Sequence, residues 1–131
     1  MRARKLMALT GLTCGILLAG NSPALAASGT AYSTDGGTRG ASTQFNDNGD
    51  SYRVCDLDGD YMRAVGWIEV RQADGSWKKF QKVEAADGVG DCNGNDVDIL
   101  RETAQVKIVA CRQNGAFATP QDCGWIIISG S

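Results

Sequence analysis

The sequence of 131 residues contains no histidine. This absence excludes Ser-His-Asp and Cys-His catalytic sites, imidazole general bases and histidine-ligated zinc sites. The sequence also lacks a stripe of basic residues. Its densest basic group is Lys78, Lys79 and Lys82, in a pattern typical of the solvated side of a strand. We therefore expect no nucleic acid and no anionic membrane surface as a partner.

Long apolar runs are also missing, apart from one near the start of the chain. Residues 2–5 are mostly basic, residues 6–19 are mostly apolar, and the small residues at 24–26 fit a signal-peptidase site. The apolar run is too short for a transmembrane helix. We expect a signal peptide over residues 1–27 and a secreted, extracellular protein without membrane insertion after its removal.

The mature chain is expected to be small, acidic and disulfide-bonded. Loss of 27 residues from 131 leaves 104, with ten basic and fifteen acidic residues and a net charge near −5. Four cysteines remain: Cys55, Cys92, Cys111 and Cys123. An even number in an oxidising compartment predicts two disulfides, and a core of this size needs such bonds for stability.

From residue 51 the sequence alternates between apolar and polar side chains. Asp-Gly and Asn-Gly pairs interrupt this alternation every eight to twelve residues and predict turns. The expected strands cover residues 51–55, 61–71, 77–83, 97–99, 104–110 and 123–129, with a loop at 90–96. The pattern predicts an all-β fold, an antiparallel immunoglobulin-like β-sandwich of six or seven short strands over residues 51–131. A small closed barrel is the alternative.

The alternation also bears on the disulfide pairing. A cysteine, a tryptophan and a distant cysteine (Cys55, Trp67 and Cys111) are typical of the buried bridge between the sheets of immunoglobulin domains. Cys55, however, shares a strand face with Arg53, and Cys111 shares one with Lys107, so both would face away from the core. We therefore favour Cys55–Cys92 and Cys111–Cys123 over the bridge between the sheets.

Residues 28–50 are rich in Gly, Ser, Thr, Asn and Asp, with Tyr32 and Phe45 as scattered aromatics. Such a composition buries too little apolar surface to offset the entropy of ordering the chain. We predict a flexible N-terminal segment here. In the alternative, the segment orders when it docks on a partner, with Tyr32 and Phe45 as contacts.

One acidic loop resembles a calcium site. Asp91, Asn93, Asn95 and Glu102 occupy positions 1, 3, 5 and 12 of an EF-hand loop, but Asp96 stands where the motif needs glycine. Asn, Asp and Gly are also the residues that tight turns require. We therefore expect turns and no cofactor, and keep a weak calcium site as the alternative.

The segment 112–122 is expected to be a loop closed by Cys111–Cys123. Phe117 is its single large apolar residue, either a partner-binding anchor or a lid on the sandwich. The same loop allows a protease inhibitor as an alternative function. A carbohydrate-binding module is another, because Trp67, Trp77 and Trp125 are candidates for a sugar-stacking platform, although tryptophan in a small sandwich is more often core. No catalytic constellation is present, so we predict no enzyme.

Three motifs carry a resemblance across residues 51–129. They are Tyr52-Arg53-Val54-Cys55-Asp56, Val109-Ala110-Cys111-Arg112 and Cys123-Gly124-Trp125. They resemble small four-cysteine secreted proteins of streptomycetes, and the architecture is similar to the adaptor subunit of the secreted umbrella toxin particles of these bacteria. That resemblance implies a non-enzymatic protein–protein interaction module within a hetero-oligomer, bridging a lectin-like subunit to a large toxin subunit, with residues 28–50 as the docking segment.

Overall fold

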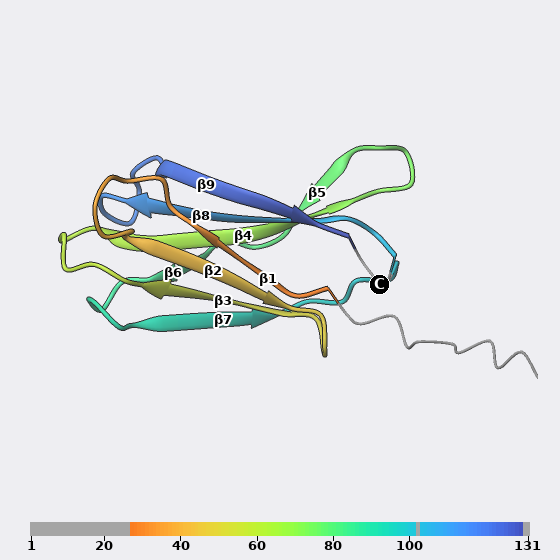
Figure 1. The fold of residues 1–131 in the computed structure, drawn as a ribbon, viewed down its shortest axis with the longest axis horizontal. Helices are drawn as coiled ribbons and strands as arrows, with labels where there is room; N and C mark the ends of the chain where they lie inside the picture. Colours follow the sequence, from red (N-terminus) through yellow and green to blue (C-terminus); the bar gives the residue numbers. More distant parts are fainter. Residues whose placement is uncertain (1–26, 102, 130–131) are drawn as a thin grey trace, which may run out of the picture.

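The computed structural model describes residues 27–101 and 103–129, which form nine β-strands and no helix (Figure 1). The strands are β1 (Gly29–Tyr32), β2 (Ala41–Asn46), β3 (Ser51–Asp56), β4 (Arg63–Arg71), β5 (Trp77–Lys79), β6 (Val83–Ala85), β7 (Cys92–Asp96), β8 (Val106–Gln113) and β9 (Gln121–Ile128). None of the described residues therefore lies in a helix that could cross a membrane. The predicted signal peptide falls almost entirely outside the described residues.

The strands form two antiparallel sheets that pack as a sandwich (Figure 1). The first sheet has the order β1-β2-β3-β7, and the second has β5-β4-β8-β9 with β6 also pairing with β4. The pairings β3–β7 and β4–β8–β9 correspond to the B–E and C–F–G pairings of immunoglobulin domains. The predicted all-β sandwich is confirmed.

The core lies between the sheets and follows the predicted alternation. Tyr52 and Val54 of β3 point inward and are buried, whereas Arg53 between them is exposed. Ile68 of β4 and Ile108 of β8 face them from the second sheet and are fully buried. Each such side chain contributes about 1.5–3 kcal/mol by leaving water.

The prediction of a flexible segment at 28–50 is wrong. These residues supply β1 and β2, which pair with each other, while β2 pairs with β3 over its whole length. Ala31, Ala41 and Phe45 are buried in the main core. Small polar residues form strands here because β3 offers a pairing edge and the second sheet covers their inward face. The folded domain thus begins at β1 and not at residue 51.

The prediction of a loop at residues 90–96 is also wrong. Cys92–Asp96 form β7, an edge strand paired with β3, and the strand predicted at 97–99 is absent, although Ile99 is buried. The sequence Cys-Asn-Gly-Asn-Asp has no apolar alternation, because β7 packs few side chains into the core. Its position is fixed by backbone pairing with β3 and by a disulfide.

The two disulfides have the predicted connectivity, Cys55–Cys92 and Cys111–Cys123. Each joins neighbouring strands of one sheet, with Cα–Cα distances of 4.1 Å, and neither crosses the core. Cys55 faces Cys92 directly in the β3–β7 register. Cys111 lies on the outer face of the second sheet and is nevertheless buried, in a small cluster with Val65, Trp67 and Val109. Two disulfides are compatible with an oxidising extracellular compartment.

Candidate functional site

Four loops meet at one end of the sandwich, which we call the loop end (Figure 1). They connect β1 to β2 (33–40), β3 to β4 (57–62), β6 to β7 (86–91) and β8 to β9 (114–120). Half of the large exposed apolar side chains of the described residues, four of eight, lie on three of these loops. They are Leu57, Tyr61, Val89 and Phe117, and both aromatic side chains are fully exposed.

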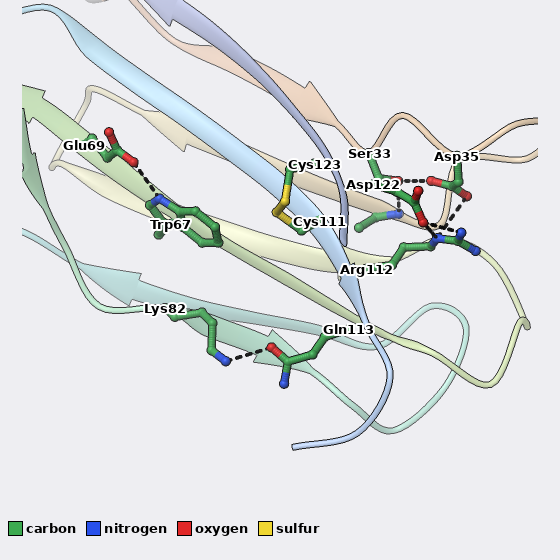
Figure 2. The surroundings of a disulfide bond; sticks show 11 residues. Ser33, Asp35, Trp67, Glu69, Lys82, Cys111, Arg112, Gln113, Asp122 and Cys123 are labelled. Atoms are coloured by element: carbon green, nitrogen blue, oxygen red, sulfur yellow. Dashed lines mark hydrogen bonds and ion pairs between the residues drawn. A yellow bond between two sulfur atoms is a disulfide. The ribbon is translucent and has the colours of Figure 1, made fainter. Parts of the chain in front are cut away.

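The β8–β9 loop is held from below by Gln113. The side chain of this residue is fully buried. Its amide nitrogen donates to the carbonyl oxygens of Gly115 at 2.6 Å and Ala116 at 3.1 Å, and its amide oxygen accepts from Lys82 Nζ at 2.8 Å (Figure 2). The N–H of Ala118 also donates to the carbonyl of Gly115. These bonds close a tight turn with Phe117 at its tip, so the side chain is presented to solvent and does not cover the sandwich.

The β3–β4 loop holds Tyr61 in an uncommon conformation. Its φ of 63° lies in the left-handed region, where a bulky residue is rarely found. The carboxylate of Asp60 restrains the backbone on both sides of Tyr61. Its Oδ1 accepts a hydrogen bond from the N–H of Met62 at 2.9 Å, and its Oδ2 accepts one from Arg112 at 2.9 Å. Strained backbone of this kind occurs most often at binding and active sites.

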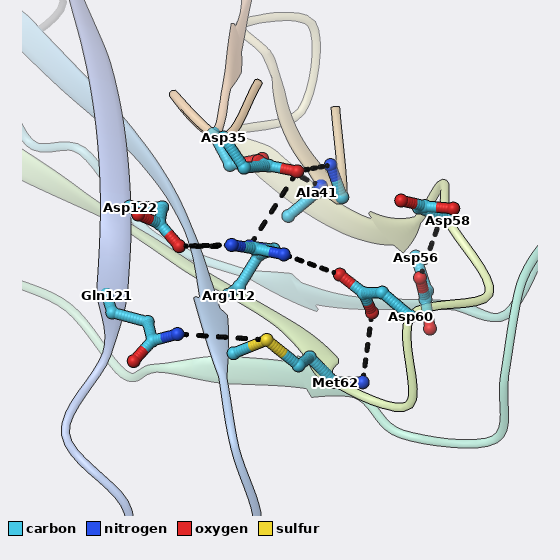
Figure 3. Close-up of polar contacts among 11 residues, drawn as sticks. Asp35, Ala41, Asp56, Asp58, Asp60, Met62, Arg112, Gln121 and Asp122 are labelled. Atoms are coloured by element: carbon cyan, nitrogen blue, oxygen red, sulfur yellow. Dashed lines mark hydrogen bonds and ion pairs between the residues drawn. The ribbon is translucent and has the colours of Figure 1, made fainter. Parts of the chain in front are cut away.

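Arg112 joins two of the four loops to strand β9 at the loop end (Figure 3). Its guanidinium pairs with Asp60 at 2.9 Å, with Asp122 of β9 at 3.1 Å from Nε, and with Asp35 of the β1–β2 loop at 3.7 Å. A register shift between Ala110 and Arg112, with a left-handed φ of 51° at Asp122, brings Asp122 to this position. We call these four residues the Arg112 cluster.

The pKa values within the Arg112 cluster follow from these contacts. Hydrogen bonds to Asp60 and then to Asp122 raise the pKa of Arg112 well above its ordinary value, so it stays charged. Burial acts to raise the pKa of Asp35, but hydrogen bonds from the hydroxyl of Ser33 and the N–H of Gly40 outweigh it and lower that pKa. The cluster therefore holds fixed charges that lock the loops together at neutral pH.

A hollow of about 490 Å³ lies between the β3–β4 and β6–β7 loops, beside the start of the β8–β9 loop. Its walls include Tyr61, Met62 and Val89, and its acidic groups are Asp56 and Asp58. Asp56 is almost completely buried. Burial raises the pKa of Asp56, and the nearby carboxylates of Asp60, Asp58 and Asp91 raise it further.

The three residues predicted to contact a partner differ in their exposure to solvent. Phe45 is fully buried in the core, so its prediction as a partner contact is wrong. Tyr32 is partly exposed on β1, with the guanidinium of Arg39 at 4.8 Å from its ring centre. Phe117 is fully exposed, as a contact residue must be, and its role stays a prediction.

The EF-hand-like ligand set is not assembled. Asn93 and Asn95 lie in an extended strand, where the amide of Asn93 donates to the carbonyl of Glu84 and the amide of Asn95 donates to the hydroxyl of Tyr52. Asp91 accepts from the N–H of Asp87, and Glu102 lies outside the described residues. A strand separates alternate side chains along its length, so these ligands cannot wrap an ion.

Another acidic group forms in space that the sequence analysis missed. Carboxylate oxygens of Asp35, Asp58 and Asp60 lie within 4.8 Å of one another. Two of these three residues pair with Arg112, which supplies the balancing charge. The residues come from loops far apart in sequence, and their only local signal was the Asp-Gly turn at 58–59.

The three tryptophans do not form a common platform. Trp67 is buried under Lys79, whose Nζ lies 3.6 Å from the ring centre, and its indole N–H donates to Glu69 (Figure 2). Trp77 faces Arg71 in the β4–β5 hairpin. Trp125 is the most exposed of the three, on the outer face of the second sheet near Ile127. Trp67 is therefore a buried packing residue, but it belongs to the small cluster around Cys111 on the outer face of the second sheet and not to the core between the sheets.

No family model, no curated protein and no solved structure matches the chain. The function must therefore be inferred from the geometry of this chain itself.

Proposed function

We propose that the protein is a secreted, non-enzymatic binding module that contacts a protein partner through its loop end, as an adaptor subunit of an extracellular assembly. One observation carries this proposal. Three loops expose Leu57, Tyr61, Val89 and Phe117 at one end of the molecule, and hydrogen bonds of Arg112 and Gln113 hold two of these loops from beneath.

Exposed aromatic side chains on ordered loops are typical of binding surfaces. Tyrosine and phenylalanine supply a large contact area with few rotatable bonds, so little conformational entropy is lost on binding. The Gln113 bonds and the Arg112 cluster order the loops before a partner arrives, which lowers the cost of association. In immunoglobulin variable domains the B–C and F–G loops bind antigen, and the β3–β4 and β8–β9 loops are their counterparts here.

An adaptor needs two separate contact surfaces. The second candidate is the outer face of the second sheet, where Trp125 and Ile127 are exposed beside the buried disulfide cluster. This surface lies along the sheet and the first lies at its end, so two partners have room to bind together. The tight turn at 115–118 disfavours the protease-inhibitor alternative, which needs an extended loop.

The test uses purification of tagged protein from the culture medium, with mass spectrometry of the co-purified chains. Three proteins are compared: the natural chain, the double variant Tyr61→Ser with Phe117→Ser, and a control, Leu100→Ser. Leu100 is equally apolar and highly exposed but lies in the β7–β8 connection at the opposite end.

A partner that binds the loop end will be recovered with the natural chain and with Leu100→Ser, and lost with the double variant. Reconstitution with that purified partner should then show a fall in affinity of about 1,000-fold for the double variant, since each aromatic anchor contributes on the order of 2 kcal/mol. Equal recovery by all three proteins would exclude the loop end as the contact surface.

A further inference from the structure

We infer that the hollow at the loop end receives a lysine or arginine side chain of the protein partner, while the exposed aromatic side chains contact apolar residues beside it. This inference rests on the proposed function and names the chemistry of its partner.

The shape of the hollow fits a long basic side chain. Tyr61, Met62 and Val89 offer apolar surface along its walls, and Asp56 and Asp58 place carboxylates among them. Lysine and arginine side chains have this same division, an apolar stem and a charged head. The stem would pack against the walls, and the head would reach the carboxylates and the ring of Tyr61, which also attracts cations.

The carboxylates have acceptor capacity left. Asp56 accepts one hydrogen bond at Oδ1, from the N–H of Asp58 at 3.2 Å (Figure 3). Among residues 27–101 and 103–129, no donor contacts its second oxygen and no lysine or arginine pairs with Asp56 or Asp58. An open carboxylate oxygen can accept a charge-assisted hydrogen bond from a lysine or arginine head, which is roughly twice as strong as a hydrogen bond between neutral groups.

The neighbouring cations of the chain are already engaged. Arg63 lines the hollow but pairs with Glu84 at 2.8 Å, and Lys82 pairs with the other oxygen of Glu84 at 2.9 Å. Arg112 divides its charge among the acids of its own cluster. Asp87 and Asp91 add further negative charge in the adjoining β6–β7 loop. The rim of the hollow therefore has an excess of negative charge, and charge complementarity favours a basic partner group.

A bound metal ion fits the hollow less well than a basic side chain. Calcium requires six to eight oxygen ligands. Few of the side chains that line this hollow carry an oxygen: Asp56 and Asp58 have carboxylates, Tyr61 a hydroxyl and Asn114 an amide. A calcium titration is nevertheless included as a rival outcome in the test below.

The test is a titration of isotope-labelled protein followed by amide NMR shifts. The probes are two peptides, acetyl-Leu-Arg-Leu-amide and its neutral counterpart acetyl-Leu-citrulline-Leu-amide. We expect the arginine peptide to shift the amides of residues 56–62, 88–89 and 114–115, with a dissociation constant at least about fivefold below that of the citrulline peptide. Raising the salt concentration from about 0.02 M to about 0.3 M should remove most of that preference.

Matched variants locate the charge that matters. Asp58→Asn should remove most of the arginine preference, whereas Asp98→Asn should leave it unchanged. Asp98 is an exposed acid in the β7–β8 connection, at the far end of the sandwich, so both variants lose the same charge. Equal binding of the two peptides, no shift with either, or displacement of the arginine peptide by calcium alone would overturn the inference.

The two proposals fail separately. If both peptides shift the loop-end amides equally, or if the Tyr61 and Phe117 variants lose a natural partner that tolerates Asp58→Asn, the loop end still binds protein and only the basic side chain is excluded. If the partner tolerates the loss of both aromatics, the proposed function itself is excluded.

Discussion

Arg112 is the residue on which the geometry of the loop end depends most. It follows the buried Cys111 in β8, yet its guanidinium reaches acids of two loops and of β9. Three carboxylates around one planar cation need its several fixed donors, and a lysine ammonium cannot meet all three in the same geometry. Because Arg112 of β8 pairs with Asp60, which directly precedes Tyr61, the Arg112 cluster restrains the backbone that orients Tyr61.

The substitution Arg112→Lys should lower the free energy of unfolding by about 2 kcal/mol, because hydrogen bonds between charged groups contribute about 1.5–3 kcal/mol. Urea denaturation followed by tryptophan fluorescence measures this change. Arg101→Lys, at an exposed position, is the control and should have no effect beyond about 0.5 kcal/mol. A loss no larger than that of the control would show that the cluster does not hold the loops.

Because of Asp56, the free energy of unfolding is expected to fall as the pH rises. Its pKa in the folded protein is raised by burial and by neighbouring carboxylates above the ordinary value of 3.8. Between those two pKa values the folded state binds more protons than the unfolded state, so the free energy of unfolding falls as the pH rises through that window. The cost of the charged carboxylate is fully present at neutral pH.

Asp56→Asn should therefore raise the melting temperature at pH 7, and its advantage over the natural chain should disappear as the pH falls below about 3.8. Asparagine keeps an oxygen that can accept from the N–H of Asp58. Thermal melts of both proteins at several pH values between 3 and 7 check this. A variant that is less stable at pH 7 would contradict the predicted sign.

At the residue scale the sequence predicted local features and missed distant ones. Phe117 stood out because it is the single large apolar residue of its loop, and strand parity gave the correct cysteine pairs. Phe45 was misplaced because its neighbours are polar, so its burial depends on β3 and the second sheet. The Arg112 cluster had no signal at all, since its acids come from positions 35, 60 and 122.

At the scale of elements, the contact between β1 and β9 closes one side of the sandwich. The N–H of Thr34 donates to the carbonyl of Asp122 at 2.8 Å. At Gly124 the two strands come so close that an added Cβ would lie 1.9 Å from the carbonyl oxygen of Tyr32. Only glycine permits this approach, because the obstructing atom belongs to the backbone and cannot rotate away.

Gly124→Ala should therefore separate β1 from β9 and lower the free energy of unfolding by about 3 kcal/mol. Gly59→Ala is the matched control, because nothing lies within 4 Å of its added Cβ and its φ is not in the left-handed region. Chemical denaturation measures stability, and amide hydrogen exchange of β1 should show faster opening. A change no larger than that of the control would contradict the close contact.

Each disulfide restrains the unfolded chain, and the restraint grows with the logarithm of the length of the loop that it closes. Cys111–Cys123 spans 12 residues and Cys55–Cys92 spans 37. Replacing the first pair by alanine should cost about 3 kcal/mol, and replacing the second pair about 4 kcal/mol. Denaturation of the two double variants gives both values. The opposite ranking would indicate that lost packing around Cys111 outweighs the loop entropy.

The elements themselves were predictable where the side chains alternate in polarity. β3, β4 and β8 were found this way, because one face of each is apolar and buried. β9 was found from its apolar run at 125–128, and its Ile126 and Ile128 are only partly buried. β1, β2 and β7 were not, because their residues are small or polar and each element exists only through pairing with a distant or neighbouring strand. Long-range pairing of this kind overrides local composition and has no signal within a short stretch of sequence.

At the scale of the whole molecule, the two sheets act as a frame that carries the proposed binding surface at one end. Every strand adjoining the loop end is paired within a sheet, and contacts between β1 and β9 and between β6 and β7 connect the sheets along both sides. Loops on such a frame can vary in sequence while keeping their positions. The fold therefore fixes where the proposed contact surface lies, but not which partner that surface would bind.

The first two strands provide the decisive test of this frame. Removing residues 28–46 would delete half of the first sheet, leave β3 without its neighbour β2, and expose the inward faces of β4 and β8, which β2 covers with Phe45 and its other inward side chains. We expect this deletion to abolish cooperative thermal unfolding and the near-ultraviolet circular dichroism signal of the packed aromatics. A chain beginning at Ser28 retains all nine strands and should unfold cooperatively. If the shortened chain instead melts like the control, residues 28–46 are a dispensable tail after all, and the sandwich needs only the strands from β3 onward.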